Sequence, residues 1–131
     1  MSDRTVYVEI LGKNYPMRFT IGASRAITDR YGSVEAMGDI ISAAGSKAIF
    51  DLVWLLELFM KQGCAYKNLF CKDEPIPENA PVVDGKWVPL TAEELEIALE
   101  MFDLAEMSDQ LFAIINRGQR KDIETQTDEK N

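Results

Sequence analysis

The two cysteines are the first candidates for chemistry, because thiols can bind a metal, form a disulfide or act as nucleophiles. Cys64 and Cys71 have no CxxC spacing, and the chain contains no histidine. A zinc site would need ligands that this sequence does not supply, so we expect no metal. The spacing is compatible with a disulfide, but no charged-then-apolar leader opens the chain. We therefore expect free thiols in a cytosolic protein.

Carboxylates are the second candidates, since they can do acid–base work or hold a hard cation. One group lies on an expected helix and the other in a proline-rich loop: Glu93, Glu94, Glu96 and Glu100, and Asp73, Glu74 and Glu78. A solvated helix face and a solvated loop explain both groups, and the EF-hand pattern is absent. Phosphate-binding loops, GxSxG and HExxH are also absent, as is the commonest general base, histidine. We expect no enzyme, no catalytic residue and no cofactor.

A third candidate is a surface for a partner. Phe50, Trp54 and Leu58 follow one another at i, i+4 and i+8 within the arc of an expected helix that otherwise carries its charges. One interpretation is that this helix is covered on nearly all sides, so that the three residues belong to the core. The other is that they bind a partner or a second copy, because Trp and Phe are frequent anchors of interfaces. The sequence leaves both interpretations open.

The helix that would position these residues spans 46–62 and is the most apolar stretch of the chain. Plotted at about 100° per residue, its polar residues fall on one arc and a wide apolar face lies opposite. That face consists of Ala48, Ile49, Leu52, Val53, Leu55, Leu56, Phe59 and Met60. We expect this helix to form the centre of the core and Gly63 to end it.

Before this helix, alternating apolar residues predict a β-hairpin over residues 5–21. We expect its turn at 12–14, and we expect Pro16 to place the second strand at an edge. Two helices follow, at about 23–31 and 34–44. Gly32 would end the first helix and Ser33 would cap the second.

After the central helix, prolines exclude a long helix between residues 71 and 90. This loop insert contains an Asp-Gly pair typical of a small hairpin at 82–88. Thr91 and Glu94 then have the spacing of a capping box, which predicts a helix over 92–116. We expect its first apolar stripe to contain Leu95, Ala98, Leu99, Phe102 and Ala105. The apolar positions then shift, so we expect Ser108 either to cap a second helical segment or to mark a bend. Residues 117–131 are mostly charged and are expected to form a disordered tail.

The expected fold is therefore mainly α with an N-terminal β-hairpin (α+β). It is a small single-domain helical bundle, residues 1–116, around the central apolar helix. The net charge is −8 over 131 residues. An acidic surface repels phosphates and anionic lipids, so we expect neither nucleic acid nor a membrane as partner.

Three short stretches, taken in order, resemble the tail assembly chaperones of long-tailed bacteriophages and related prophages. They are YPMRFT at the end of the hairpin (15–20), DRYGS at the end of the small helix (29–33) and PLTAEEL at the start of the last helix (89–95). The resemblance covers roughly residues 5–110. The sequence departs from the family in its proline-rich insert, 71–90.

This resemblance implies a non-enzymatic protein that binds the tape measure protein, and in some systems the tail tube protein, while the tail is built. Such a chaperone acts in the host cytoplasm and is absent from the mature virion. Self-association is also compatible with it. The alternative from another class is a small phage or prophage protein that regulates or inhibits one host protein by binding it.

Overall fold

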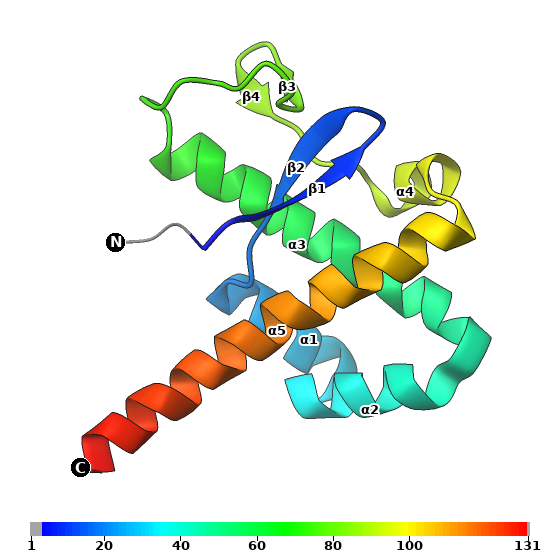
Figure 1. Ribbon diagram of the computed structural model, residues 1–131, viewed down its shortest axis with the longest axis vertical. Helices are drawn as coiled ribbons and strands as arrows, with labels where there is room; N and C mark the ends of the chain where they lie inside the picture. The colour runs from blue at the N-terminus through cyan, green and yellow to red at the C-terminus, as the bar shows by residue number, and fades with distance from the viewer. Residues whose placement is uncertain (1–3, 131) are drawn as a thin grey trace.

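A computed structural model describes the backbone of residues 4–130 and the side chains of residues 4–116. The expected class, mainly helical with an N-terminal antiparallel hairpin, is confirmed (Figure 1). The elements in chain order are β1 (Val6–Ile10), β2 (Lys13–Met17), α1 (Ile21–Tyr31), α2 (Val34–Ala44), the 3₁₀ turn η1 (Gly45–Lys47), α3 (Ala48–Phe70), β3 (Val82–Val83), β4 (Lys86–Trp87), α4 (Ala92–Ala98) and α5 (Met101–Lys130). The disordered tail expected at 117–131 lies outside the residues whose side chains are described, and it stays a prediction.

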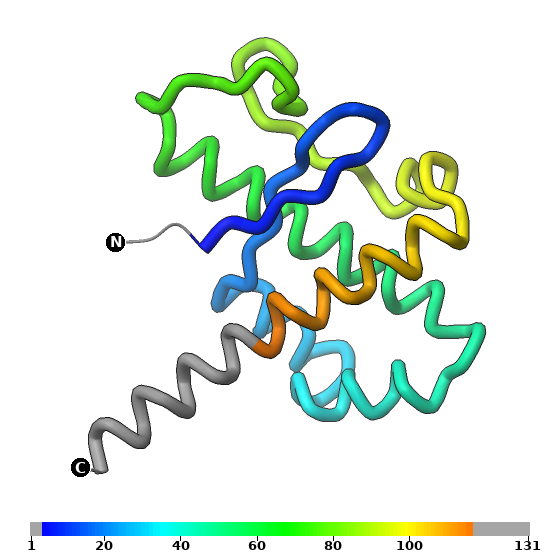
Figure 2. The backbone as a smooth tube through the Cα atoms, in the orientation of Figure 1, coloured from blue at the N-terminus to red at the C-terminus, as the bar shows by residue number. Residues whose placement is uncertain are grey.

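The helix α3 is the centre of the molecule and contacts β2, β4 and each of the other helices. Figure 2 shows the insert beside the C-terminal end of α3, whereas α2 leads into its N-terminal end. The side chains of Leu55, Leu56, Phe59 and Met60 are completely buried. These residues belong to the apolar face expected from the sequence, so burial of that face organises the fold.

One expectation about α3 is wrong: Gly63 does not end it, and the helix continues to Phe70. A Cβ atom built on Gly63 would lie 2.2 Å from the carbonyl oxygen of Pro16. The glycine is therefore needed where the backbone of β2 lies against the helix. Close by, the N–H of Arg18 donates to the carbonyl of Phe59 over 3.2 Å.

The turn of the first hairpin also differs from the expectation. Ile10 pairs with Lys13, so the loop consists of Leu11 and Gly12 rather than residues 12–14. Both loop residues have positive φ, 51° and 80°, as a type I′ turn requires. Strand pairing ends at Met17, and α1 begins at Ile21 with Thr20 as its N-cap.

The expected hairpin inside the insert is confirmed, since β3 and β4 pair across Asp84 and Gly85. The side chain of Asn68 on α3 holds this hairpin by two hydrogen bonds to the backbone of Trp87. The N–H of Trp87 donates to Asn68 Oδ1 over 2.9 Å, and Asn68 Nδ2 donates to the Trp87 carbonyl over 3.0 Å. The buried indole of Trp87 packs with Cys64 and Ala80, so the insert has a small core of its own.

The helix expected over 92–116 is interrupted at Leu99, whose backbone is extended, and α5 begins at Met101. Asp103 accepts a hydrogen bond from the N–H of Glu100 over 3.0 Å at this new start. The break changes the helical phase, so Phe102 and Ala105 are exposed rather than buried. The buried stripe of α5 contains Leu104, Met107, Leu111, Ile114 and Ile115. No break occurs at Ser108, whose hydroxyl donates to the Ala105 carbonyl within the helix.

Candidate partner-binding groove

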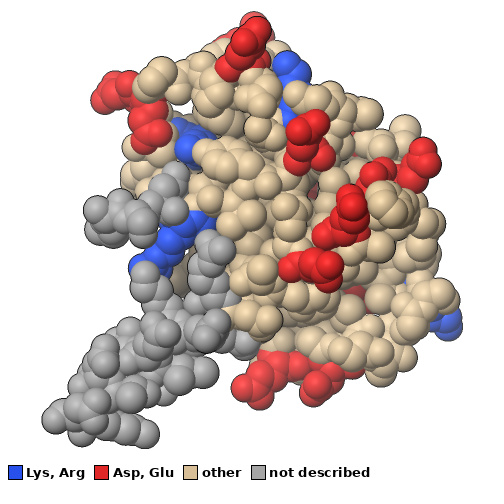
Figure 3. Space-filling view, in the orientation of Figure 1, with Lys and Arg blue, Asp and Glu red and all other residues tan. Residues whose placement is uncertain are grey.

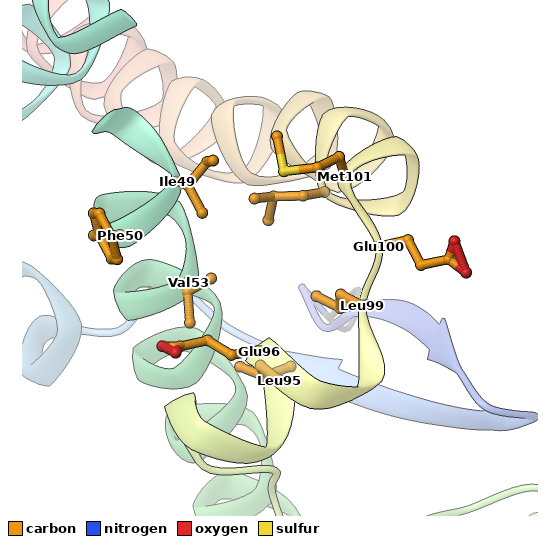
Figure 4. Close-up of a pocket in the computed structure, with 9 residues that line it drawn as sticks. Ile49, Phe50, Val53, Leu95, Glu96, Leu99, Glu100 and Met101 are labelled. Carbon is orange, nitrogen blue, oxygen red and sulfur yellow. The ribbon is translucent and has the colours of Figure 1, made fainter. Parts of the chain in front are cut away.

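An apolar groove lies between α3, α4 and the start of α5, with a volume of about 350 Å³ (Figure 4). Its lining is predominantly aliphatic and comes from three segments of the chain. The lining residues are Ile49, Phe50, Val53, Leu95, Glu96, Leu99, Glu100, Met101 and Leu104. A groove of this composition can take apolar side chains of another polypeptide.

The first wall of the groove is α4, which is fastened to α3. The side chain of Leu95 is completely buried. At the N-terminus of α4, the N–H of Ala92 donates to Glu57 Oε2 over 2.6 Å. The expected capping box is present, with Thr91 and Glu94 each accepting from the other's backbone N–H. Glu57, which the sequence placed on the polar arc of the central helix, thus anchors α4.

The second wall is the start of α5, and the break at Leu99 creates it. The extended backbone there, with φ −100° and ψ 143°, redirects the chain between α4 and α5. Met101 consequently lies across the groove from Ile49 (Figure 4), and Leu104 also lines this space.

Two carboxylates, Glu96 and Glu100, line the groove, and other acidic residues follow along α4 and α5. Between Thr91 and Asn116 the chain has seven acidic residues and no lysine or arginine: Glu93, Glu94, Glu96, Glu100, Asp103, Glu106 and Asp109. All of them except Asp103 are exposed. Figure 3 shows acidic side chains over the part of the surface formed by α4 and α5. The groove therefore combines an apolar interior with a negative rim, which favours a basic partner.

The structure divides the three residues that the sequence analysis proposed for partner binding. Phe50 is 69% exposed and lines the groove. Trp54 is half-buried, with the Tyr31 ring edge-on at 5.8 Å and the Arg30 guanidinium 4.7 Å from its own ring. Leu58 is half-buried against the core. Of the three residues, only Phe50 lines the groove, where it lies with residues of α4 and α5.

Two residues of the polar arc of α3 are hydrogen-bonded to α1 and its N-cap. The hydroxyl of Tyr31 donates to the Asp51 carboxylate, and the hydroxyl of Thr20 donates to the side chain of Gln62. Burial, together with the hydrogen bond to Asp51, raises the pKa of Tyr31 above its usual value. The charged arc thus faces another helix over part of its length.

Sequence reasoning missed three large apolar side chains near the groove. Ile97, Met101 and Phe102 are 80%, 64% and 72% exposed. Phe102 had been assigned to the buried stripe. Ile97 and Met101 fall outside that stripe, in a segment without lysine or arginine. Their position outside the stripe is the sequence feature that could have indicated an exposed apolar surface.

The other candidate groups are not assembled into a reactive site in the described part of the chain. Cys64 is buried, and burial raises the pKa of its thiol to about 12. A thiol with such a pKa is a poor nucleophile at neutral pH. Asp73, Glu74 and Glu78 are exposed in the insert. Among the described residues, no three potential metal ligands lie together.

No family model, no curated protein and no solved structure matches this chain. In the described residues, no helix combines the length and the apolar character needed to cross a membrane.

Proposed function

We propose that this protein is a non-enzymatic phage tail assembly chaperone, of the kind that binds the tape measure protein, and in some systems the tail tube protein, during tail assembly. It would act in the host cytoplasm and be absent from the mature virion. The observation that carries the proposal is the apolar groove with its acidic rim between α3, α4 and α5. The resemblance in YPMRFT, DRYGS and PLTAEEL supplies the identity of the partner.

The groove fits one face of an amphipathic helix. Apolar side chains at i, i+3 or i+4, and i+7 would enter it and replace water against Leu99, Met101 and Leu104. Lysine or arginine residues flanking that face would lie near Glu96 and Glu100. Such binding would shield the apolar face of a long helical protein from aggregation until the tail tube polymerises around it.

The proposal is tested by measuring binding to the tape measure protein encoded in the same genome. Phe50→Ala removes an exposed side chain from the groove, so it should weaken binding by about 30-fold or more, as loss of a hot spot does. The stability of the free protein should change by less than about 1 kcal/mol, because Phe50 is mostly exposed.

The matched control is Phe70→Ala, which removes the same side chain from the other end of α3, where it is 72% exposed. It should leave the affinity unchanged. Equal losses in the two variants would exclude the groove as the binding site. If the wild-type protein binds a host protein and not the tape measure protein, the chaperone proposal fails and the regulatory alternative is favoured.

A further inference from the structure

The two edges of the N-terminal hairpin differ in their backbone hydrogen bonds to the rest of the protein. Along the outer edge of β2, the N–H of Asn14 donates to the Asn79 carbonyl over 2.9 Å, and the N–H of Arg18 donates to the Phe59 carbonyl over 3.2 Å. Pro16, between them, has no N–H. The outer edge of β2 is therefore covered by the insert and α3.

The pairing register then determines which groups of β1 point outward. Tyr7 lies opposite Pro16, and Glu9 lies opposite Asn14. In an antiparallel pair, residues directly opposite each other point their backbone groups either both inward or both outward. Since Asn14 donates outward, the N–H and C=O groups of Tyr7 and Glu9 must also point away from β2.

This edge of β1 is open. In the described chain, no backbone hydrogen bond outside the hairpin begins or ends at Tyr7 or Glu9. Both residues are exposed, and β1 crosses in front of α3 in Figure 1. The strand, VYVEI, contains neither of the residues that most often protect an edge, lysine and proline. Such an edge can accept another strand.

We propose that β1 pairs antiparallel with β1 of a second copy, about a two-fold axis at Val8. Tyr7 of each copy then lies opposite Glu9 of the other copy. Each of these two pairs exchanges both of its backbone hydrogen bonds, which gives four bonds across the interface. The two hairpins become one four-stranded sheet, with the order β2-β1-β1-β2.

Charge complementarity favours a second copy over an unrelated strand. The face of the hairpin that bears Tyr7 lies near two cations, Lys67 and Arg18, of a chain whose net charge is −8. The Lys67 ammonium is 5.4 Å from the centre of the Tyr7 ring, and Arg18 Nη1 donates to Thr5 Oγ1 over 2.9 Å. The second copy brings its Glu9 carboxylate to this face, opposite Tyr7, and receives the same arrangement in return.

The inference does not depend on the proposed function, because β1 does not line the groove. A dimer of this kind would carry two grooves. A partner with repeated apolar faces could then be held by both grooves, with the gain in affinity that bivalent binding provides.

The decisive variant is Glu9→Pro. It removes the outward N–H of β1, while the inward hydrogen bonds of Val8 and Ile10 to β2 remain, and Pro16 shows that the hairpin accepts proline at an outward position. Two hydrogen bonds are lost per dimer, so sedimentation should show a dissociation constant raised about tenfold or more. Glu9→Ala keeps the N–H and should have a smaller effect. Far-UV circular dichroism of both variants reports whether the fold is retained.

Cross-linking tests the register even if the proline variant fails to fold. In a Cys71→Ser background, a mixture of Tyr7→Cys and Glu9→Cys chains should form a disulfide between copies faster than Tyr7→Cys alone. The proposal is overturned if the wild-type chain remains a monomer from about 1 µM to 1 mM. It is also overturned if Phe50→Ala abolishes the dimer while Glu9→Pro leaves it intact, since that would place the interface at the groove.

Discussion

At the scale of single residues, Gly63 shows a conflict between helix propensity and packing. A glycine in a helix costs about 1 kcal/mol relative to alanine, so its position in the interior of α3 requires a compensating contact. That contact is with Pro16, whose carbonyl carbon and oxygen would lie 2.4 and 2.2 Å from a Cβ atom on Gly63. The close approach brings the hairpin onto the central helix.

We predict that Gly63→Ala destabilises the protein by about 3 kcal/mol or more, because the backbone of β2 would have to move away from α3. Urea unfolding measures the change. The control is Gly38→Ala in α2, where a Cβ atom would meet nothing within 4 Å. That substitution should stabilise the protein by up to about 1 kcal/mol. Stabilisation by both substitutions would contradict the close packing at Gly63.

The buried thiol of Cys64 leads to a pH prediction. Burial raises its pKa from 9.0 to about 12, so the thiol ionises in the unfolded chain before it ionises in the folded protein. Below pH 9 the thiol is neutral in both states, and the free energy of unfolding keeps the full contribution of this group. As the pH rises from about 9 to 12 that contribution is lost, by at most about 1.4 kcal/mol per pH unit.

Denaturant unfolding of the wild type and of Cys64→Ala, repeated across this pH range, checks the prediction. The difference in stability between the two proteins should shrink as the pH rises. Burial, and after it the charge of Cys64, also raises the pKa of Tyr15; the variant retains the burial of this tyrosine, so only the part due to Cys64 enters the comparison. Parallel pH profiles would show that the thiol is not buried as described.

At the scale of elements, α1 and α3 are joined through Trp54, where the sequence allowed either core or interface. The ring packs edge-on against Tyr31 and beneath the Arg30 guanidinium. We predict that Trp54→Ala costs about 3 kcal/mol of folding stability, in contrast to Phe50→Ala. Thermal unfolding of the two variants side by side measures this. If the Trp54→Ala protein is as stable as the wild type, Trp54 does not belong to the core, and the interpretation as a partner-binding residue is favoured.

Asn68 is one of the residues that hold the insert on α3, since its side chain pairs with both backbone groups of Trp87. Asn68→Ala leaves these two groups without that partner, so it should cost about 1–3 kcal/mol and open the insert locally. Hydrogen exchange should speed up in β3 and β4 but not in β1 and β2. Leu69→Ala, at an exposed neighbouring position, serves as the control.

At the scale of the whole molecule, the charge is unevenly distributed. The groove is bordered by a segment with seven carboxylates and no cation between residues 91 and 116. If the partner is a basic helix, its affinity should fall by about tenfold or more between 50 and 500 mM salt, because screening weakens exposed charge pairs. Titration calorimetry at several salt concentrations measures this. An affinity independent of salt would mean that the acidic rim does not select the partner.

Several features of the fold follow from the sequence alone, because they depend on local chemistry. The helix over 34–44 was predicted at its observed bounds, since Ser33 caps it and Gly45 follows it. The capping box of Thr91 and Glu94 marked the start of α4 in the same way. The apolar face of the central helix depends on its period alone, and Leu55, Leu56 and Phe59 are buried as that period requires.

The remaining features were decided by tertiary contacts that no local pattern contains. Gly63 resembles a helix stop in the sequence, and only the strand packed against it explains why the helix continues there. The break at Leu99 cannot be read from its neighbours, because the apolar residues on both sides fit one continuous helix. In the structure, Leu95 and Leu104 on the two sides of the break both belong to the core and line the groove, whereas Phe102 is exposed. Residue periodicity thus determined which helices form, whereas their packing determined where the apolar groove lies.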